Sequence, residues 1–192
     1  GSTDGTADLV RRWQHRHVRY VWQERRERSA ARNAGIELAR TPWIAFLDSD
    51  DIWDPNHLES LVRAARPDVA AVYSGFRQSR GPGQPSLRHT RGGLSGDLFH
   101  GIAFERVSMI PSGSMVRREA LRAVGGFPLG LRIGEDWVLF LKLAARWFLA
   151  SSREVTTVLR EHSGRSMRVA LLAASNDAPC GAATRLGVRW HF

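Results

Sequence analysis

The amino-acid sequence predicts an α/β fold in which helices cover a mainly parallel sheet. Between residues 6 and 75, segments with helical spacing of apolar residues alternate with short strand-like segments, as in βαβ units. Residues 43–47 form a continuous apolar run, which is typical of a strand buried on both faces. This run ends in a group of acidic residues that starts at Asp48, where ligand sites of such sheets lie.

Helices are predicted from apolar spacing together with their start and stop signals. A first helix follows the turn Asp4–Thr6, and a second begins at Ser29 and ends before Pro42. Asp54 and Pro55 are typical of a helix start. The complete set of predicted helices is 7–13, 29–38, 54–65, 118–124 and 135–147.

Strands are predicted where short apolar runs lie between turn signals. They are residues 18–21, 43–47, 69–73, 114–116 and 155–159. From Gly75 to Gly96 the composition shifts to Gly, Pro, Ser and Arg without a hydrophobic period, which predicts a long loop. After Met167 the pattern fades, and we assign residues 168–192 to a tail without a role.

Length and composition indicate one globular domain. The chain has 192 residues, of which 43% are hydrophobic, and its formal net charge is +9. Such a charge favours anionic partners, which leaves nucleic acid, acidic lipid and diphosphate-bearing substrates open. Lys142 is the only lysine, so the excess of arginine is itself weak evidence. The single Cys180 excludes an internal disulfide and is typical of a reducing compartment.

The sequence has neither a signal peptide nor an apolar stretch of membrane-spanning length. We therefore expect a soluble or peripheral protein in the cytoplasm. Gly1 already lies in a turn-like segment, so we expect the natural protein to begin further upstream.

The segment Asp48-Ser49-Asp50 is a candidate metal site. Side chains two residues apart on an extended segment point to the same side, so both carboxylates can meet on one hard cation such as Mg²⁺ or Mn²⁺. The same acids would also simply end a strand and cap a helix, and the two readings are equally weighted on this segment alone.

Six segments, in order, resemble blocks of family 2 glycosyltransferases. They are residues 1–6, 29–36, 46–51, 125–127, 134–137 and 160–162. The resemblance covers residues 1–167, which we expect to form a partial catalytic domain. It implies a Rossmann-like α/β/α sandwich with a mainly parallel sheet, the GT-A fold, but lacking the first strands. It also implies inverting transfer from a nucleotide-diphospho-sugar to an acceptor hydroxyl.

Roles for single residues follow from the same resemblance. Asp136 would be the general base and Glu135 would position substrate, although both acids also suit plain capping of a helix. The metal ligands would be Asp50, Asp48 and His162, and the donor would contact Arg32, Asp48, Asp50 and Asp51. A solvated surface role for Arg32 is nearly as well supported. The acceptor-side residues would be Ser112, Gly113 and Trp137.

The resemblance implies a bacterial setting in envelope polysaccharide or glycolipid synthesis. The acceptor would be a saccharide or a lipid-linked molecule, with peripheral contact to the inner face of the membrane. Strands that family members place before the first block are absent. An inactive truncated fragment therefore stays open as an alternative, as does a basic nucleic-acid-binding module along Arg11–Arg32, although we expect no nucleic-acid partner.

Overall fold

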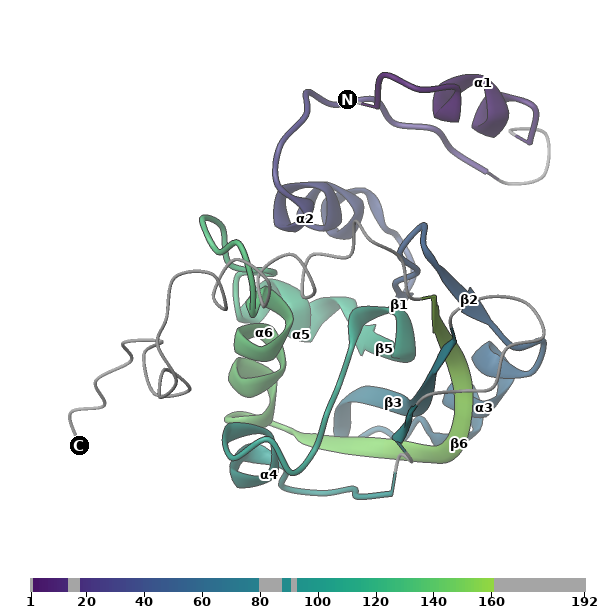
Figure 1. Ribbon diagram of the computed structural model, residues 1–192. Coiled ribbons are helices and arrows are strands. Elements are labelled where there is room, and N and C mark those ends of the chain that lie inside the picture. The colour runs from purple at the N-terminus through teal and green to yellow at the C-terminus, as the bar shows by residue number, and fades with distance from the viewer. Residues whose placement is uncertain (1, 14–17, 80–87, 91–92, 161–192) are drawn as a thin grey trace, which may run out of the picture.

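The computed structural model describes residues 2–13, 18–79, 88–90 and 93–160. The helices are α1 (Thr6–Arg11), α2 (Arg28–Leu38), α3 (His57–Ala64), α4 (Phe99–Ala103), α5 (Arg118–Ala123) and α6 (Glu135–Ala144). The strands are β1 (Trp43–Ala45), β2 (Asp51–Trp53), β3 (Val69–Ser79), β4 (Arg88–Thr90), β5 (Ser114–Arg117) and β6 (Phe148–Arg160). A 3₁₀ turn, Pro111–Gly113, precedes β5. Figure 1 shows this arrangement.

One mixed sheet joins the six strands. Its order is β1-β5-β3-β6-β2, and β4 pairs with β3 outside this path. Only β3 and β6 run parallel among the described strands, whereas the other four pairs are antiparallel. The prediction of a mainly parallel sheet was therefore wrong for this part of the chain. An apolar strand run does not reveal the direction of its partner, because burial on both faces looks the same in either case.

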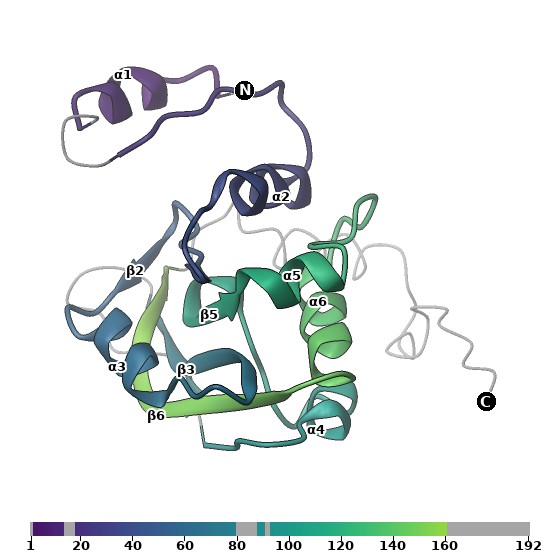
Figure 2. The same ribbon diagram turned by 180° about the vertical axis from the view of Figure 1, so that it is seen from behind.

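Helices cover both faces of the sheet, as the α/β/α prediction required. Side chains of α2, α4, α5 and α6 form the larger core with Tyr73, Val116 and Leu149. On the opposite face, Leu61 of α3 packs against Val72 and its neighbours. Figures 1 and 2 show α3 on one side of the sheet and α5 and α6 on the other. Alternation of side chains along each strand supplies both cores.

The long strand β6 curls the sheet and brings its end beside the acidic residues. The pairing of β3 with β6 jumps from Tyr73–Ser151 to Gly75–Val155, so β6 carries two extra residues there. Arg153 lies in this bulge with a φ of 61°. A bulge bends a strand and increases its twist. Beyond it, residues 157–159 pair with β2, which directly follows Asp50.

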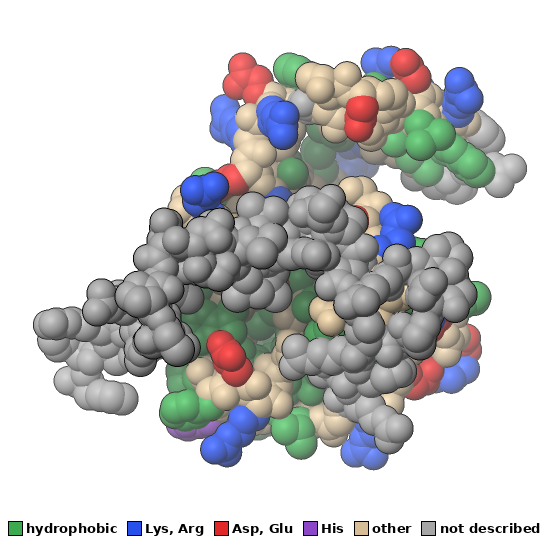
Figure 3. Space-filling model, in the orientation of Figure 1, with side chains coloured by type: hydrophobic (Ala, Val, Ile, Leu, Met, Phe, Trp, Pro, Cys, Tyr) green, Lys and Arg blue, Asp and Glu red, His purple; other side chains and the backbone are tan. Residues whose placement is uncertain are grey.

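The N-terminal segment differs from its prediction. Residues 18–21 form no strand, because no described strand lies beside them to pair with their backbone. Helix α1 has no buried residue, and it lies apart from the sheet in both views (Figures 1 and 2). Leu9, Trp13 and Trp22 are exposed, and Figure 3 shows apolar side chains on this surface.

Several other helices and strands begin or end at residues that differ from those predicted. The run Gly75–Ser79, predicted as loop, continues β3, and the short elements β2 and α4 were not predicted. Strand β1 is only half-buried, because it lies at the end of the strand order instead of inside it. Within the described residues, no helix is long and apolar enough to cross a membrane.

His57, the first residue of α3, anchors that helix to the sheet. Its ring is 1% exposed, stacks on Trp53 with a centroid separation of 4.6 Å, and bonds through Nδ1 to the Thr156 hydroxyl at 2.7 Å. Burial, opposed by the nearby charge of Asp54, lowers the pKa of His57 from 6.5 to about 4. The histidine is therefore neutral at pH 7.

This low pKa predicts that the fold loses stability in mild acid. The unfolded chain takes up the proton near pH 6.5 and the folded chain only near pH 4, so stability falls as the pH drops through that window. The loss attributable to His57 is about 3 kcal/mol between pH 7 and pH 4. Urea unfolding at several pH values measures the free energy of unfolding, and in His57→Phe this part of its pH dependence should be absent.

The exposed His100 supplies a matched control, since His100→Phe removes a histidine without removing a buried one. We expect its pH profile to follow the wild type. If the unfolding free energy of His57→Phe fell with pH as steeply as that of the wild type, the role assigned to His57 would be contradicted.

Candidate active site

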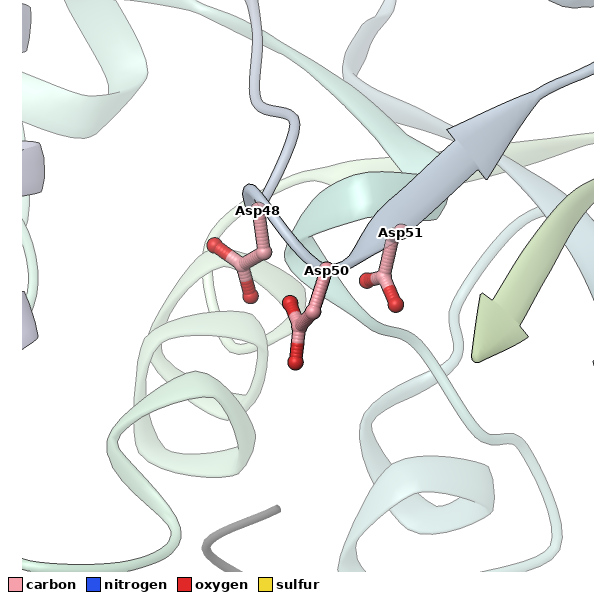
Figure 4. Close-up of side chains that lie close together, drawn as sticks. All are labelled: Asp48, Asp50 and Asp51. Atoms are coloured by element: carbon pink, nitrogen blue, oxygen red, sulfur yellow. The ribbon is translucent and has the colours of Figure 1, made fainter. Parts of the chain in front are cut away.

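Three carboxylates meet at the turn between β1 and β2. One oxygen from each of Asp48, Asp50 and Asp51 lies within 4.8 Å of the others. Figure 4 shows all three side chains directed to the same side of the chain. Asp51 is buried and the other two are half-buried. Hard carboxylate oxygens at this spacing match the ligands that Mg²⁺ and Mn²⁺ prefer.

Arg32 of α2 links this turn to helix α6. Its Nη2 donates to both carboxylate oxygens of Asp48, at 2.7 and 2.8 Å, and its Nη1 donates to Glu135 at 3.1 Å. The Arg32 side chain is 11% exposed and its guanidinium lies over the Phe127 ring at 5.0 Å. Burial alone would lower the pKa of Arg32, but its bonds to Asp48 and Glu135 raise it overall. Arg32 is therefore not a solvated surface residue.

Glu135, the first residue of α6, is the second carboxylate that contacts Arg32. Its side chain is 4% exposed, and besides Arg32 it contacts Nε of Arg28 at 2.5 Å. Arg28 also donates to the Arg132 carbonyl at 2.8 Å. A buried carboxylate forms strong, charge-assisted contacts with two guanidinium groups. Glu135 is therefore suited to holding the two arginines in place.

Asp136, the next residue of α6, lies in surroundings that differ from those of Glu135. Burial, together with the neighbouring charge of Glu135, raises the pKa of Asp136, while the Trp137 backbone N–H, at 2.8 Å, and the charge of Arg32 act against it. A carboxylate with a raised pKa is a better proton acceptor near neutral pH. The two adjacent acids thus differ in their surroundings, since Glu135 contacts two arginines and the Asp136 carboxylate accepts from the Trp137 N–H.

The acidic residues share one cavity of about 240 Å³. Its polar wall contains the three aspartates of the turn together with Glu135 and Asp136. Its apolar wall is formed by Phe76, Ile110, Pro111, Ile133 and Leu159. Strands β3 and β6 thus contribute to the same hollow as the turn and the start of α6. The arrangement places three carboxylates that could hold a metal ion and the separate carboxylate of Asp136 around one cavity.

Asn33 fixes the position of the loop that leads to α6. Its side-chain amide donates to the Phe127 carbonyl and its oxygen accepts from the Phe127 N–H, both at 2.8 Å. Gly126 has a φ of 69°, and a Cβ there would lie 2.5 Å from the Asn33 oxygen. Only glycine therefore fits next to this pair. Asn33 and Phe127 lie in two separate segments that resemble the family (29–36 and 125–127), but their mutual contact was not predicted.

Two further contacts hold the acidic turn by its backbone. The Asp48 N–H donates to the Ser112 hydroxyl at 3.0 Å. Arg160, at the end of β6, donates to the carbonyls of Ser49 and Asp50, at 3.2 and 2.8 Å. Arg160 lies in the family-like block 160–162, but the resemblance implied a role for His162 only, so the contact of Arg160 with the acidic turn was not predicted.

The remaining predicted site residues fall in three places. Ser112 lines the cavity but is 1% exposed, and Gly113 is buried behind it in the same turn. Trp137 points to α4, where its Nε1 donates to the Ile102 carbonyl at 3.0 Å. His162 lies outside the described residues. Acceptor contacts of the first three residues and metal binding by His162 stay predictions.

Comparison with known proteins identifies related sequences. Residues 1–125 match the model of the family described as Glycosyl transferase family 2. Validoxylamine A glucosyltransferase of Streptomyces hygroscopicus subsp. jinggangensis is 38% identical over 89 residues, 44% of this chain. An uncharacterized glycosyltransferase of Rickettsia bellii is 26% identical over 161 residues, 82% of this chain. The matched regions span 21% and 23% of these relatives' own lengths.

A solved structure shares the fold. It is the mannosyltransferase PcManGT from Pyrobaculum calidifontis in complex with GDP-Man and Mn²⁺, with a TM-score of 0.63 and 23% sequence identity. The match covers 93% of this chain and 54% of that one. The expected GT-A fold is confirmed by this likeness, although the described sheet is mixed.

The link through Arg32 predicts a large loss of stability in Arg32→Met. Two carboxylates, one of them buried, would lose their shared partner, and such a loss costs about 3 kcal/mol. Chemical denaturation at pH 7 measures the difference in unfolding free energy. Arg122→Met removes the exposed pair with Glu37 and should cost about 0.5 kcal/mol or less. Equal losses in the two variants would contradict the linking role.

Proposed function

Since the chain belongs to glycosyl transferase family 2, we propose that it transfers a sugar from a nucleotide-diphospho-sugar to an acceptor hydroxyl with inversion at the anomeric carbon. The observation that carries this proposal is the single cavity in which the acidic turn and Asp136 meet. A metal-dependent donor site and a general base must lie within reach of one sugar for this chemistry. Because the matched regions span only 21% and 23% of the relatives' own lengths, the activity is a proposal and is not taken over from them.

Asp50, Asp51 and Asp48 would hold the divalent cation, with His162 as a further predicted ligand. Three oxygens within 4.8 Å of one another fit Mg²⁺ or Mn²⁺, and the related mannosyltransferase structure contains Mn²⁺. When bound, the cation would offset the negative charge that develops on the diphosphate leaving group. Asp48 pairs with Arg32, so its carboxylate would serve both the arginine and the cation.

Asp136 would accept the proton of the acceptor hydroxyl. The hydroxyl oxygen then bonds to the anomeric carbon while the bond from that carbon to the diphosphate oxygen breaks, and the nucleoside diphosphate leaves with the electron pair. No protein nucleophile is needed for this single displacement. The raised pKa of Asp136 suits it to this step.

The loop before α6, which reaches the cavity at Ile133, favours an acceptor with an apolar portion. Leu129, Leu131 and Ile133 are exposed on the loop before α6, and Ile133 also lines the cavity. This loop is held to α2 by the Gly130 N–H, which donates to Glu27 at 2.8 Å, and by Arg28 on the Arg132 carbonyl. A lipid-linked acceptor used at the cytoplasmic face of a bacterial membrane therefore fits better than a free saccharide. Envelope polysaccharide or glycolipid assembly stays the proposed setting.

Loss of the metal ligand should weaken nucleotide binding. With Mn²⁺ present, we expect Asp50→Ala to bind GDP or UDP at least about tenfold more weakly than the wild type, a difference of about 1.4 kcal/mol. Isothermal titration with and without EDTA measures the metal-dependent part. Asp68→Ala is the control, because Asp68 lies on the surface and pairs with Arg66. Equal Mn²⁺-dependent binding by wild type and Asp50→Ala would contradict the proposal.

Removal of the base should affect turnover and leave donor binding unchanged. In Asp136→Asn, kcat for sugar transfer should fall roughly 10²–10⁴-fold, while the donor dissociation constant stays within error. The wild-type rate should rise with pH through the raised pKa of Asp136 and then level off, since only the ionised carboxylate accepts a proton. The rate of donor consumption with a supplied acceptor measures both effects.

The same substitution should not destabilise the fold. Burial disfavours the charged form of Asp136, so the ionised group costs stability at pH 7 and the neutral amide removes that cost. We expect a thermal midpoint equal to or above that of the wild type. A lower midpoint together with lost activity would indicate a structural role in place of a catalytic one.

A further inference from the structure

Trp53 lies on β2, two residues after the proposed ligand Asp51, and hydrogen bonds join it to the backbone of Asp48. Its indole Nε1 donates to the Ser112 carbonyl at 2.6 Å. The hydroxyl of the same Ser112 accepts from the Asp48 N–H at 3.0 Å. We call this series, from the indole through Ser112 to the Asp48 backbone, the Trp53–Ser112–Asp48 chain. Residue 53 was given no role by the sequence motifs.

The 3₁₀ turn that carries Ser112 is buried and packed from several strands. Pro111, Ser112 and Gly113 are all buried. Thr157 of β6 donates weakly to the Ser112 carbonyl at 3.4 Å, and Ser74 of β3 lies within 3.4 Å of the Gly113 carbonyl. The indole bond is much the shortest of these contacts. Trp53 therefore supplies the main donor that fixes the orientation of the Ser112 peptide.

The indole is itself held in one orientation. Its ring stacks on His57 at an interplanar angle of 23°, and His57 is tied to Thr156 of β6. Because this histidine is buried and uncharged at neutral pH, the stack is a contact between two neutral rings. The orientation of the Trp53 N–H thus follows from the packing of α3 against β6.

We propose that Trp53 is a positioning residue which, through Ser112, sets the backbone of Asp48 and thereby the metal affinity of the acidic turn. The proposal rests on the proposed function, since it assigns a cation to that turn. Arg32 fixes the carboxylate of Asp48, and the Trp53–Ser112–Asp48 chain fixes its backbone. Both contacts matter for Asp48 as a metal ligand, because the groups behind a ligand determine where its oxygen atoms lie and so the metal affinity.

The test is a double-mutant cycle on Mn²⁺ affinity. Mn²⁺ alone is titrated into the 192-residue chain, and the free-ion electron paramagnetic resonance signal reports binding. Trp53→Phe keeps a ring on His57 and removes the N–H, whereas Ser112→Ala removes the hydroxyl. Each variant should raise the Mn²⁺ dissociation constant about fivefold or more. The double variant should bind no more weakly than the worse single variant, because both act through one series of bonds.

A second readout follows the Asp48 N–H directly. Its amide hydrogen exchange should be slow in the wild type and at least about tenfold faster in both single variants, because a broken hydrogen bond exposes the amide. Trp147→Phe is the matched control, since Trp147 is also half-buried but packs in the larger core and does not line the cavity. It should leave both the exchange rate and Mn²⁺ affinity unchanged.

The outcomes separate this inference from the proposed function. If the wild type binds Mn²⁺ and Trp53→Phe changes neither affinity nor Asp48 exchange, the positioning role is wrong and the proposed function stands. If the two single effects on affinity multiply in the double variant, the residues act independently and the role is again wrong. If the wild type binds no Mn²⁺ even with GDP or UDP, the proposed function fails, and the positioning of a metal ligand fails with it.

Discussion

The buried guanidinium of Arg32 is the interaction on which the rest of the site depends. It joins Asp48, on the turn after β1, to Glu135, on the first turn of α6. These two segments lie far apart in the sequence, and helix α2 carries the charge that keeps their carboxylates close together. A buried ion pair of this kind contributes less to net stability than to fixing one arrangement. The cavity exists in its observed form because this arrangement is fixed.

Several of the arginines have a structural role in the fold. Arg28 and Arg32 face the cavity acids, Arg160 holds the carbonyls of the acidic turn, and Arg117 donates to three carbonyls around residues 66–69. Arginine suits these positions because its planar fork makes several hydrogen bonds at once. The basic run Arg11–Arg32 therefore includes residues that serve the acidic site, which weakens its reading as a nucleic-acid surface.

The sequence allowed most helices, the family and the acidic cluster to be predicted, because those features depend on local spacing and on short motifs. Helix α2 and the buried core of β3 matched closely. Strand direction could not be predicted, since it depends on long-range pairing. The Asn33–Phe127 pair and the contact of Trp53 with Ser112 join residues 94 and 59 positions apart, and no local pattern encodes such contacts. The resemblance implied different roles for Asp136 and Glu135, and the structure adds that Glu135 contacts two arginines whereas burial raises the pKa of Asp136.

One crystallographic measurement tests the central claim most directly: an anomalous difference map from crystals of this chain grown with Mn²⁺ and a nucleoside diphosphate. If the donor site and the proposed base share one cavity, we expect a single strong peak bounded by the carboxylates of Asp48, Asp50 and Asp51. The diphosphate should then lie between that peak and Asp136. A bound nucleotide without a peak at this turn, or a peak elsewhere on the molecule, would contradict the claim.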